Sequence, residues 1–185
     1  MADKDDAAAG EGPSVTPVIA MSGAPTFPFG PPGSTPDDPA GRFGARLAPL
    51  GDRLGLTRLG AMLTSVEPGK RAFPFHNHLA NDELFVILEG TGELRLGDAT
   101  HPVKAGDVVG CPRGGPDTAH QLVNTGTAVL VYLAVSSTND PDIAEYPDSG
   151  KFIALAVAPG PDYLHAHLRH VAKRDDGRDY WEGEA

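Results

Sequence analysis

Four side chains in this sequence have the types and the spacing of a metal site: His76, His78, Glu83 and His120. On a strand, residues i and i+2 point to the same face, so His76 and His78 can offer two imidazoles to one ion while Asn77 points away. Glu83 opens the next strand after a short loop, which lets the chain reverse and brings a carboxylate beside the histidines. His120 heads a later strand and supplies a fourth candidate ligand.

The alternative is that these residues are structural, because a single histidine in a β protein is more often exposed or hydrogen-bonded than bound to a metal. Burying His76, His78 and Glu83 on one face without an ion would leave polar groups unsatisfied, which favours the metal interpretation. The argument for His120 is weaker when that residue is taken alone. Asp82 is a rival carboxylate of the opposite parity, and we assign it to the loop before the strand.

Short strands separated by turns must position these side chains. The chain has 18 prolines and 23 glycines, which interrupt it too often for long helices. The segment 83–89, ELFVILE, is apolar on both faces, as in a central strand with a layer on each side. About eight strands at short, regular spacing lie between residues 51 and 138, a pattern typical of an all-β barrel or sandwich.

Three regions follow from this pattern. Residues 1–50 form a Pro/Gly-rich N-terminal arm, residues 51–138 form the barrel, and residues 139–185 form a C-terminal extension. Within the arm, Phe27 and Phe29 alternate with prolines in a segment that lies either along a sheet or partner, or in solvent. In the extension we expect a loop over NDPDIAEYPDSG, one strand at FIALAV, and a charged tail from HLRH onward.

Composition excludes several classes of function. The net charge of −10, from 15 basic and 25 acidic residues, argues against a nucleic-acid partner, which needs clustered Lys and Arg. The longest apolar run, AVLVYLAV, is far shorter than the roughly 20 residues of a membrane helix. The single cysteine, Cys111, rules out an intrachain disulfide, and the acidic start MADKDD lacks the features of a secretion signal. We therefore expect a cytoplasmic protein without a membrane partner.

Two groups of residues resemble the paired signature motifs of the cupin superfamily, whose fold is a double-stranded β-helix, or jelly-roll, barrel. The first group is Gly69, His76, His78, Glu83 and Gly90, and the second is Gly106, Pro112, Gly114, His120 and Asn124. The spacing departs from the general pattern in two places, between Gly69 and His76 and in the longer loop between Gly114 and His120. Within the superfamily the chain is most similar to single-domain bacterial cupins of uncharacterised function.

This resemblance implies that His76, His78, Glu83 and His120 coordinate one divalent transition metal, and iron, manganese, nickel and zinc all suit such ligands. It also implies a metal-dependent enzyme for a small oxygenated metabolite, of the dioxygenase, isomerase, decarboxylase or lyase type. The alternatives are a non-catalytic cupin that binds a small molecule and a barrel whose metal is structural. The sequence does not identify a general acid or base.

Three further features bear on partners and on other sites. His165, His167 and His170 are grouped near the C-terminus, but no carboxylate follows at a useful spacing, and we interpret them as a surface segment. Trp181 in the acidic tail suggests that the tail docks on another protein surface, because a tryptophan side chain is normally buried in a contact. Together with the open sheet edge of a small barrel, this predicts a homodimer.

Overall fold

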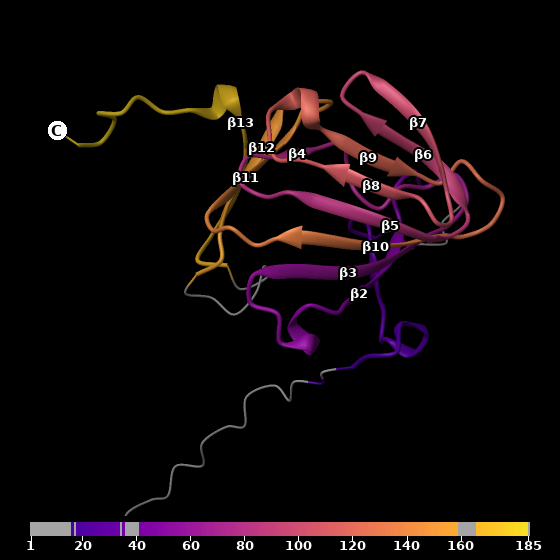
Figure 1. Ribbon diagram of the computed structural model, residues 1–185. Coiled ribbons are helices and arrows are strands. Elements are labelled where there is room, and N and C mark those ends of the chain that lie inside the picture. The colour runs from indigo at the N-terminus through magenta and orange to yellow at the C-terminus, as the bar shows by residue number, and fades with distance from the viewer. Residues whose placement is uncertain (1–15, 17, 34, 36–40, 159–165, 185) are drawn as a thin grey trace, which may run out of the picture.

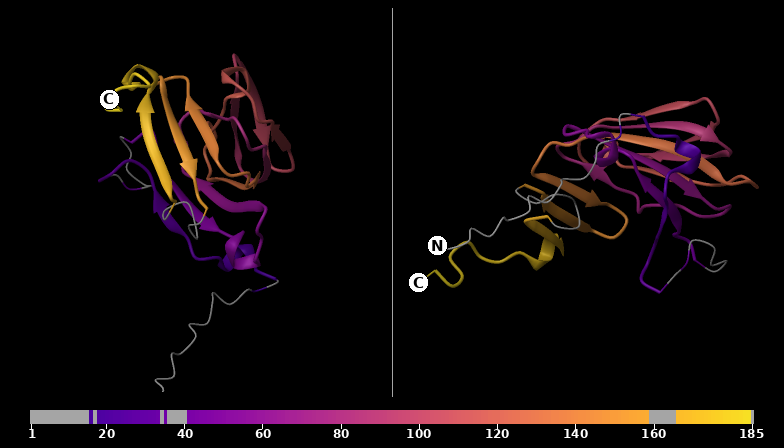
Figure 2. Two further views of the ribbon diagram at one scale, coloured as in Figure 1. Left: turned by 90° about the vertical axis from the view of Figure 1, so that its left-hand side faces the viewer. Right: turned by 90° about the horizontal axis from the view of Figure 1, so that it is seen from below.

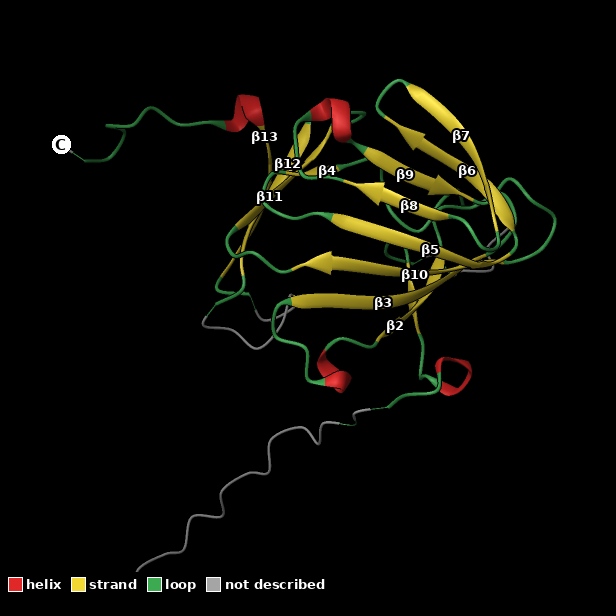
Figure 3. Ribbon diagram, in the orientation of Figure 1, coloured by secondary structure: helices red, strands yellow, loops and turns green. Residues whose placement is uncertain are grey.

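The computed structural model describes residue 16, residues 18–33, residue 35, residues 41–158 and residues 166–184. Strands dominate this part of the chain, and the helices are single 3₁₀ turns (Figure 3). The 3₁₀ helices are Met21–Gly23, Asp52–Leu54, Pro116–Thr118 and Arg174–Asp176. The strands are β1 (Phe27–Phe29), β2 (Ala45–Pro49), β3 (Leu59–Val66), β4 (Asn77–His78), β5 (Glu83–Glu89), β6 (Thr91–Leu96), β7 (Ala99–Lys104), β8 (Val108–Cys111), β9 (His120–Val123), β10 (Leu130–Ser137), β11 (Asp142–Tyr146), β12 (Lys151–Ala156) and β13 (Leu168–Lys173).

These strands pair in three antiparallel sheets (Figure 1). The largest has the order β1-β2-β3-β10-β5-β8, a second has the order β7-β6-β9, and the third has the order β13-β12-β11-β4. The first two sheets face each other as the walls of an all-β barrel of the double-stranded β-helix type. The predicted fold class and the eight strands between residues 51 and 138 are therefore confirmed.

The core lies between the two barrel walls, where apolar side chains at alternate strand positions are buried. In β5, Phe85 and Ile87 are 6% and 1% exposed, whereas Leu84 on the opposite face is 40% exposed. The expectation that both faces of this strand are covered is thus wrong for its outer face. The buried cluster consists of Ala45, Leu47, Val66, Ala72, Phe85, Ile87, Leu94, Val103, Val109, Cys111, Leu122, Leu130 and Tyr132.

One tight turn ties the two walls together. Gly90 joins β5 to β6 with φ of 80°, a left-handed conformation that favours glycine. A Cβ at this position would also collide with the carbonyl oxygen of Val129. The turn signal Glu89-Gly90 therefore marks a place where only glycine fits both the backbone and its neighbour.

The C-terminal extension forms more structure than its sequence suggests. The stretch NDPDIAEYPDSG, predicted as a loop, contains β11, and the predicted charged tail begins with β13. Both predictions are wrong because strand pairing in this sheet overrides the proline and charge content of the segments. The C-terminal sheet stands at one end of the barrel, and β4 is its innermost strand (Figures 1 and 2).

The N-terminal arm also joins the fold over part of its length. Strand β2 pairs with β3, and β1 pairs with β2, so Phe27 and Phe29 lie along a sheet. The ring of Phe29 packs against Phe73 with 5.1 Å between centroids, although both arm phenylalanines remain about two-fifths exposed. In the described residues, no helix has the length and apolar character needed to cross a membrane.

Candidate metal centre

The four residues singled out by sequence converge at the end of the barrel nearest the C-terminal sheet. His78 lies in β4, Glu83 begins β5 and His120 begins β9. His76 precedes β4 and forms an isolated bridge with His120, in which the two residues exchange backbone hydrogen bonds of 3.2 and 2.8 Å. Asn77 points the other way and is fully buried, as the alternation of side chains along a strand requires.

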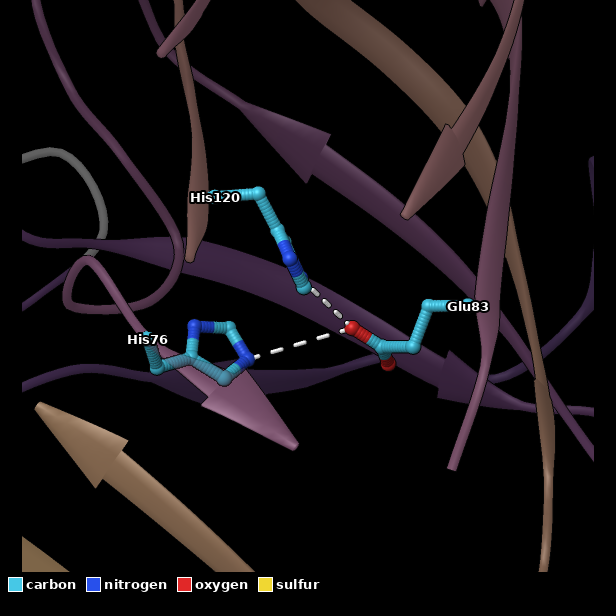
Figure 4. A group of neighbouring side chains, drawn as sticks. All are labelled: His76, Glu83 and His120. Carbon is cyan, nitrogen blue, oxygen red and sulfur yellow. Dashed lines mark hydrogen bonds and ion pairs between the residues drawn. The ribbon is translucent and has the colours of Figure 1, made fainter. Parts of the chain in front are cut away.

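Three imidazole nitrogens lie near one carboxylate oxygen, and Figure 4 shows two of these rings, His76 and His120, with Glu83. The Nε2 atoms of His120, His78 and His76 lie 2.8, 3.8 and 3.9 Å from Oε2 of Glu83. Donor atoms bound about 2.1 Å from one ion are separated by roughly 3–4 Å, so these distances suit a shared cation. His76, Glu83 and His120 have ligand atoms that all lie within 4.8 Å of one another, and His78 is outside that group.

The outer ring nitrogens are oriented by the surrounding chain. Nδ1 of His76 donates to the carbonyl oxygen of Pro74 at 2.8 Å, and Nδ1 of His120 lies 3.3 Å from the carbonyl oxygen of Thr118. A carbonyl oxygen only accepts, so the proton of the His76 ring belongs on Nδ1. His120 donates from Nε2 to Oε2 of Glu83 at 2.8 Å. The longer loop before His120 thereby supplies the carbonyl that orients this ring.

His78 has a different outer partner. Its Nδ1 lies 2.6 Å from Oδ2 of Asp142, a residue of β11 in the C-terminal sheet. All three rings therefore present Nε2 inward and Nδ1 outward, which is the arrangement of histidines that bind a metal through Nε2. The residues present fit a divalent transition metal, since three imidazoles and one carboxylate are ligands that iron, manganese, nickel and zinc accept.

Burial and mutual charge set the protonation of this cluster. Burial, together with the positive charge of His120, lowers the pKa of His76 to about 4. Burial alone would raise the pKa of Glu83, but the hydrogen bond from His120 and the charges of the other histidines lower it. At neutral pH, His76 is neutral and Glu83 is ionised, the states in which both can bind a cation.

A cavity of about 270 Å³ adjoins Glu83 on the inside of the barrel wall. Its polar groups are the carboxylates of Asp52 and Glu83 and the hydroxyls of Thr64 and Ser136, while Met62 and Phe73 contribute apolar surface. Thr64 is fully buried and lies opposite Tyr132 in the pairing of β3 with β10. No lysine or arginine is among the described residues that line this cavity.

The other residues considered from sequence lie away from the cluster or have simple roles. Asp82 accepts the backbone N–H of Arg113 at 2.8 Å, which agrees with its assignment to the loop. Cys111 is buried, and burial followed by the charge of Glu83 raises its pKa to about 12, as expected for an unreactive thiol. His101 is exposed in β7, His170 is exposed in β13, and His165 lies outside the described residues.

Sequence reasoning missed one residue of the C-terminal extension and three polar residues of the barrel. Asp142 was assigned to a loop, and nothing in its spacing from His78 signals their contact, because they are 64 residues apart. Asp52, Thr64 and Ser136 were not singled out, since isolated hydroxyl and carboxyl residues are common at strand ends. The alternation of β3 and β10 would have placed Thr64 and Ser136 on one inner face had the register been known.

Comparison with known proteins finds one family model, one relative in sequence and two similar structures. The family model described as Cupin domain matches residues 62–136. An uncharacterized protein of Methanocaldococcus jannaschii is 35% identical over 74 residues, which are 38% of this chain and 57% of the length of that relative.

A provisionally assigned sugar phosphate isomerase of Acidithiobacillus ferrooxidans is similar in structure, with 28% identity, a TM-score of 0.61, and coverage of 72% of this chain and 80% of that one. A cupin superfamily sugar phosphate isomerase of Silicibacter pomeroyi has 25% identity, a TM-score of 0.63, and coverage of 75% and 82%.

Proposed function

We propose that this chain, whose residues 62–136 match the Cupin domain family model, is a divalent-metal-dependent enzyme that acts on a small oxygenated metabolite. The observation that carries the proposal is the convergence of His76, His78 and His120 on Glu83 through their Nε2 atoms. Iron, manganese, nickel and zinc remain the candidate ions. When bound there, such an ion polarises a carbonyl or enolate oxygen of the substrate.

The size and lining of the adjoining cavity suit a small substrate that carries hydroxyl or carbonyl groups. Its volume of about 270 Å³ is close to the lower end of ligand pockets, which begin at roughly 300 Å³. The hydroxyls of Thr64 and Ser136 can bond a hydroxylated or carbonyl-bearing group, and Phe73 and Met62 exclude water from it. Without a lysine or arginine in the described lining, a phosphate or second carboxylate of the substrate would lie outside this cavity.

Among the reaction types open to such a centre, an isomerisation of a hydroxycarbonyl compound is the one we favour. Two structures at 25–28% identity are named as sugar phosphate isomerases, one of them provisionally. This reaction moves a proton between neighbouring carbons, and it needs a base that is not held by the metal. Asp52 is the only carboxylate besides Glu83 in the described lining of the cavity, and we propose it for that role.

The test has a binding part and a turnover part. Metal analysis of the purified protein should show about one ion per chain, and the His76→Ala, His78→Ala double variant should lose most of it. The Asp52→Asn variant should keep the ion but lose turnover of small hydroxycarbonyl substrates. Equal metal content in the wild type and the double variant would contradict the site.

A non-catalytic cupin that binds a small molecule is the second candidate. The small volume of the cavity favours it, since a substrate and a base must share that space. In this case Asp52→Asn would alter ligand affinity, and no turnover would be found for the wild-type protein with any of the compounds it binds.

The predicted homodimer also stays a proposal. Tyr180 and Trp181 are 82% and 71% exposed, a large aromatic surface for a tail that a second copy could cover. Light scattering after size-exclusion chromatography should give about twice the 19.3 kDa mass of one chain. A single species at the monomer mass would overturn this proposal.

A further inference from the structure

A carboxylate of the C-terminal sheet holds one histidine of the metal centre. Oδ2 of Asp142 lies 2.6 Å from Nδ1 of His78, and Oδ1 accepts the backbone N–H of Ala80 at 3.0 Å. We propose that Asp142 is a positioning residue, which keeps the proton of His78 on Nδ1 and so leaves the Nε2 lone pair free for a cation. This inference rests on the metal site of the proposed function.

The chemistry of the contact dictates the tautomer. An ionised carboxylate only accepts hydrogen bonds, so the hydrogen between Asp142 and His78 belongs to the ring. A neutral imidazole carries one such hydrogen, and Nε2, which lies 3.8 Å from Oε2 of Glu83, is then unprotonated. A metal can bind this nitrogen without displacing a proton, and partners of this kind also fix the orientation of a ligand ring.

Backbone pairing fixes the carboxylate itself. Strand β11 runs antiparallel to β4, with Ala144 opposite His78 and Glu145 opposite Asn77. The backbone N–H of Leu79 donates to the carbonyl oxygen of Ile143 at 2.8 Å, which continues this pairing. Asp142 is 8% exposed and therefore keeps its two hydrogen bonds away from competing water.

The same strand contacts the second histidine of the pair. The ring of Tyr146 is stacked near His76, with 6.2 Å between centroids and 27° between planes. Strand β11 thus backs both His76 and His78, while the barrel provides Glu83 and His120. The C-terminal sheet is in this view a part of the metal centre and not an appendage.

Replacing Asp142 by Asn gives a sharp expectation. Asparagine has one oxygen in place of two, and the N–H of Ala80 can only be satisfied by that oxygen. The amide NH₂ then faces Nδ1 of His78 and donates to it, which moves the ring proton to Nε2. The Asp142→Asn variant should accordingly present a protonated nitrogen to the metal, although its shape is almost unchanged.

The first measurement is long-range ¹H–¹⁵N NMR of the imidazoles in metal-free protein at pH 8. The wild type should show His78 with its proton on Nδ1, and Asp142→Asn should show it on Nε2. An unchanged tautomer in the variant would overturn the inference, whether or not the protein binds a metal. This measurement is therefore independent of the proposed function.

The second measurement is the affinity for Zn²⁺ by competition with a chromophoric chelator. Asp142→Asn should lower the affinity about 10- to 100-fold, the usual cost of losing such a partner. Glu145→Gln is the matched control, because Glu145 also bonds β4 through Nδ2 of Asn77 but touches no imidazole of the cluster. The control should bind Zn²⁺ within about twofold of wild type.

The outcomes separate the two proposals. A wild-type protein that binds no Zn²⁺, Fe²⁺, Mn²⁺ or Ni²⁺ would refute the proposed metal function, and the NMR result would still decide the role of Asp142. A wild type that binds metal with equal losses in Asp142→Asn and Glu145→Gln would show that β11 only stabilises the fold. Losses confined to Asp142→Asn would support its positioning role.

Discussion

Glu83 and His120 lie on barrel strands that pair along their length, whereas His76 and His78 sit on and beside a strand of two residues that depends on the C-terminal sheet. His120 has a side chain that is 3% exposed, and that of His78 is 22% exposed. The barrel half of the centre is built by long-range pairing within one domain, and the other half is added by a second sheet. The candidate ligands are therefore held in place partly by the barrel and partly by the C-terminal sheet.

The candidate ligands therefore differ in how easily their positions can change. A barrel wall is fixed by its core, and a ligand there can move only if the core moves. His76 is tied to His120 of the barrel by two backbone hydrogen bonds, whereas His78 is held through β11, so changes in the C-terminal extension can alter the position of His78 without disturbing the barrel.

The largest effect is expected at the residue that both halves share. Glu83→Gln removes the charge on which the three Nε2 atoms converge, and we expect metal affinity to fall by at least about 1,000-fold, or roughly 4 kcal/mol. Calorimetric titration with Zn²⁺ measures this loss. Asp82→Asn, which changes the neighbouring loop carboxylate, should bind almost as the wild type does, and similar losses in both variants would argue against a specific site.

The barrel half should be the more costly one to disrupt. Asn124 is fully buried, donates to the carbonyl oxygens of Val66 and Ala128, and accepts the N–H of Gly126. Asn124→Ala leaves these groups unpaired and should lower the free energy of unfolding by about 3 kcal/mol.

Urea denaturation of the metal-free protein checks this value. Asn139→Ala, which removes the exposed side-chain bond to the carbonyl oxygen of Ala80, should cost under about 1 kcal/mol. A smaller loss for Asn124→Ala than for this control would reverse the ranking of the two regions.

Acid should destabilise the metal-free protein through His76. His76 has a pKa of about 4 in the folded chain, whereas an unfolded histidine titrates near 6.5. Between these values the unfolded chain binds a proton that the folded chain does not, so stability is lost as the pH falls through this window. The loss should reach about 2–3 kcal/mol at pH 4.5.

Denaturation curves recorded from pH 7 to pH 4.5 in the presence of a chelator measure this dependence. His76→Gln removes the titrating group and should flatten the curve, while His101→Gln on the exposed face of β7 should leave it unchanged. A His76→Gln curve as steep as that of the wild type would show that other groups govern the acid response.

The smallest effect is expected at the outer surface of the C-terminal sheet. Arg174 forms an ion pair with Glu145, but the arginine side chain is 75% exposed and solvent screens the pair. Arg174→Ala should change the free energy of unfolding by less than about 1 kcal/mol and leave Zn²⁺ affinity unchanged. A larger loss of affinity would mean that the sheet transmits surface changes to β4 more strongly than its buried contacts suggest.

Much of the barrel could be predicted from sequence because its signals are local. Glycine and proline mark the turns, and alternation along β5 sets Phe85 and Ile87 on the inner face beside Glu83. The grouping of His76, His78 and Glu83 followed from residue types and parity, and the full set with His120 was implied by the resemblance to the cupin motifs. These inferences need no knowledge of which distant strands pair.

The C-terminal sheet could not be predicted in the same way, because β11 inverts the usual pattern. Asp142 and Ala144 are its buried residues, and Ile143 between them is 39% exposed. A strand whose inward face carries a carboxylate and a methyl group gives no hydrophobic signal. The inward carboxylate makes sense only beside His78, a partner that local sequence does not reveal.

The two-residue length of β4 has a consequence for how this protein is made. His78 is separated by 64 residues from the carboxylate that orients it, so the histidine pair cannot be fully held until β11 has been synthesised and has paired. In a nascent chain in which only the barrel walls have folded, Glu83 and His120 are in place, but His78 is not yet oriented by Asp142. Orientation of His78 is thereby a late step of folding, which follows the pairing of β11 with β4.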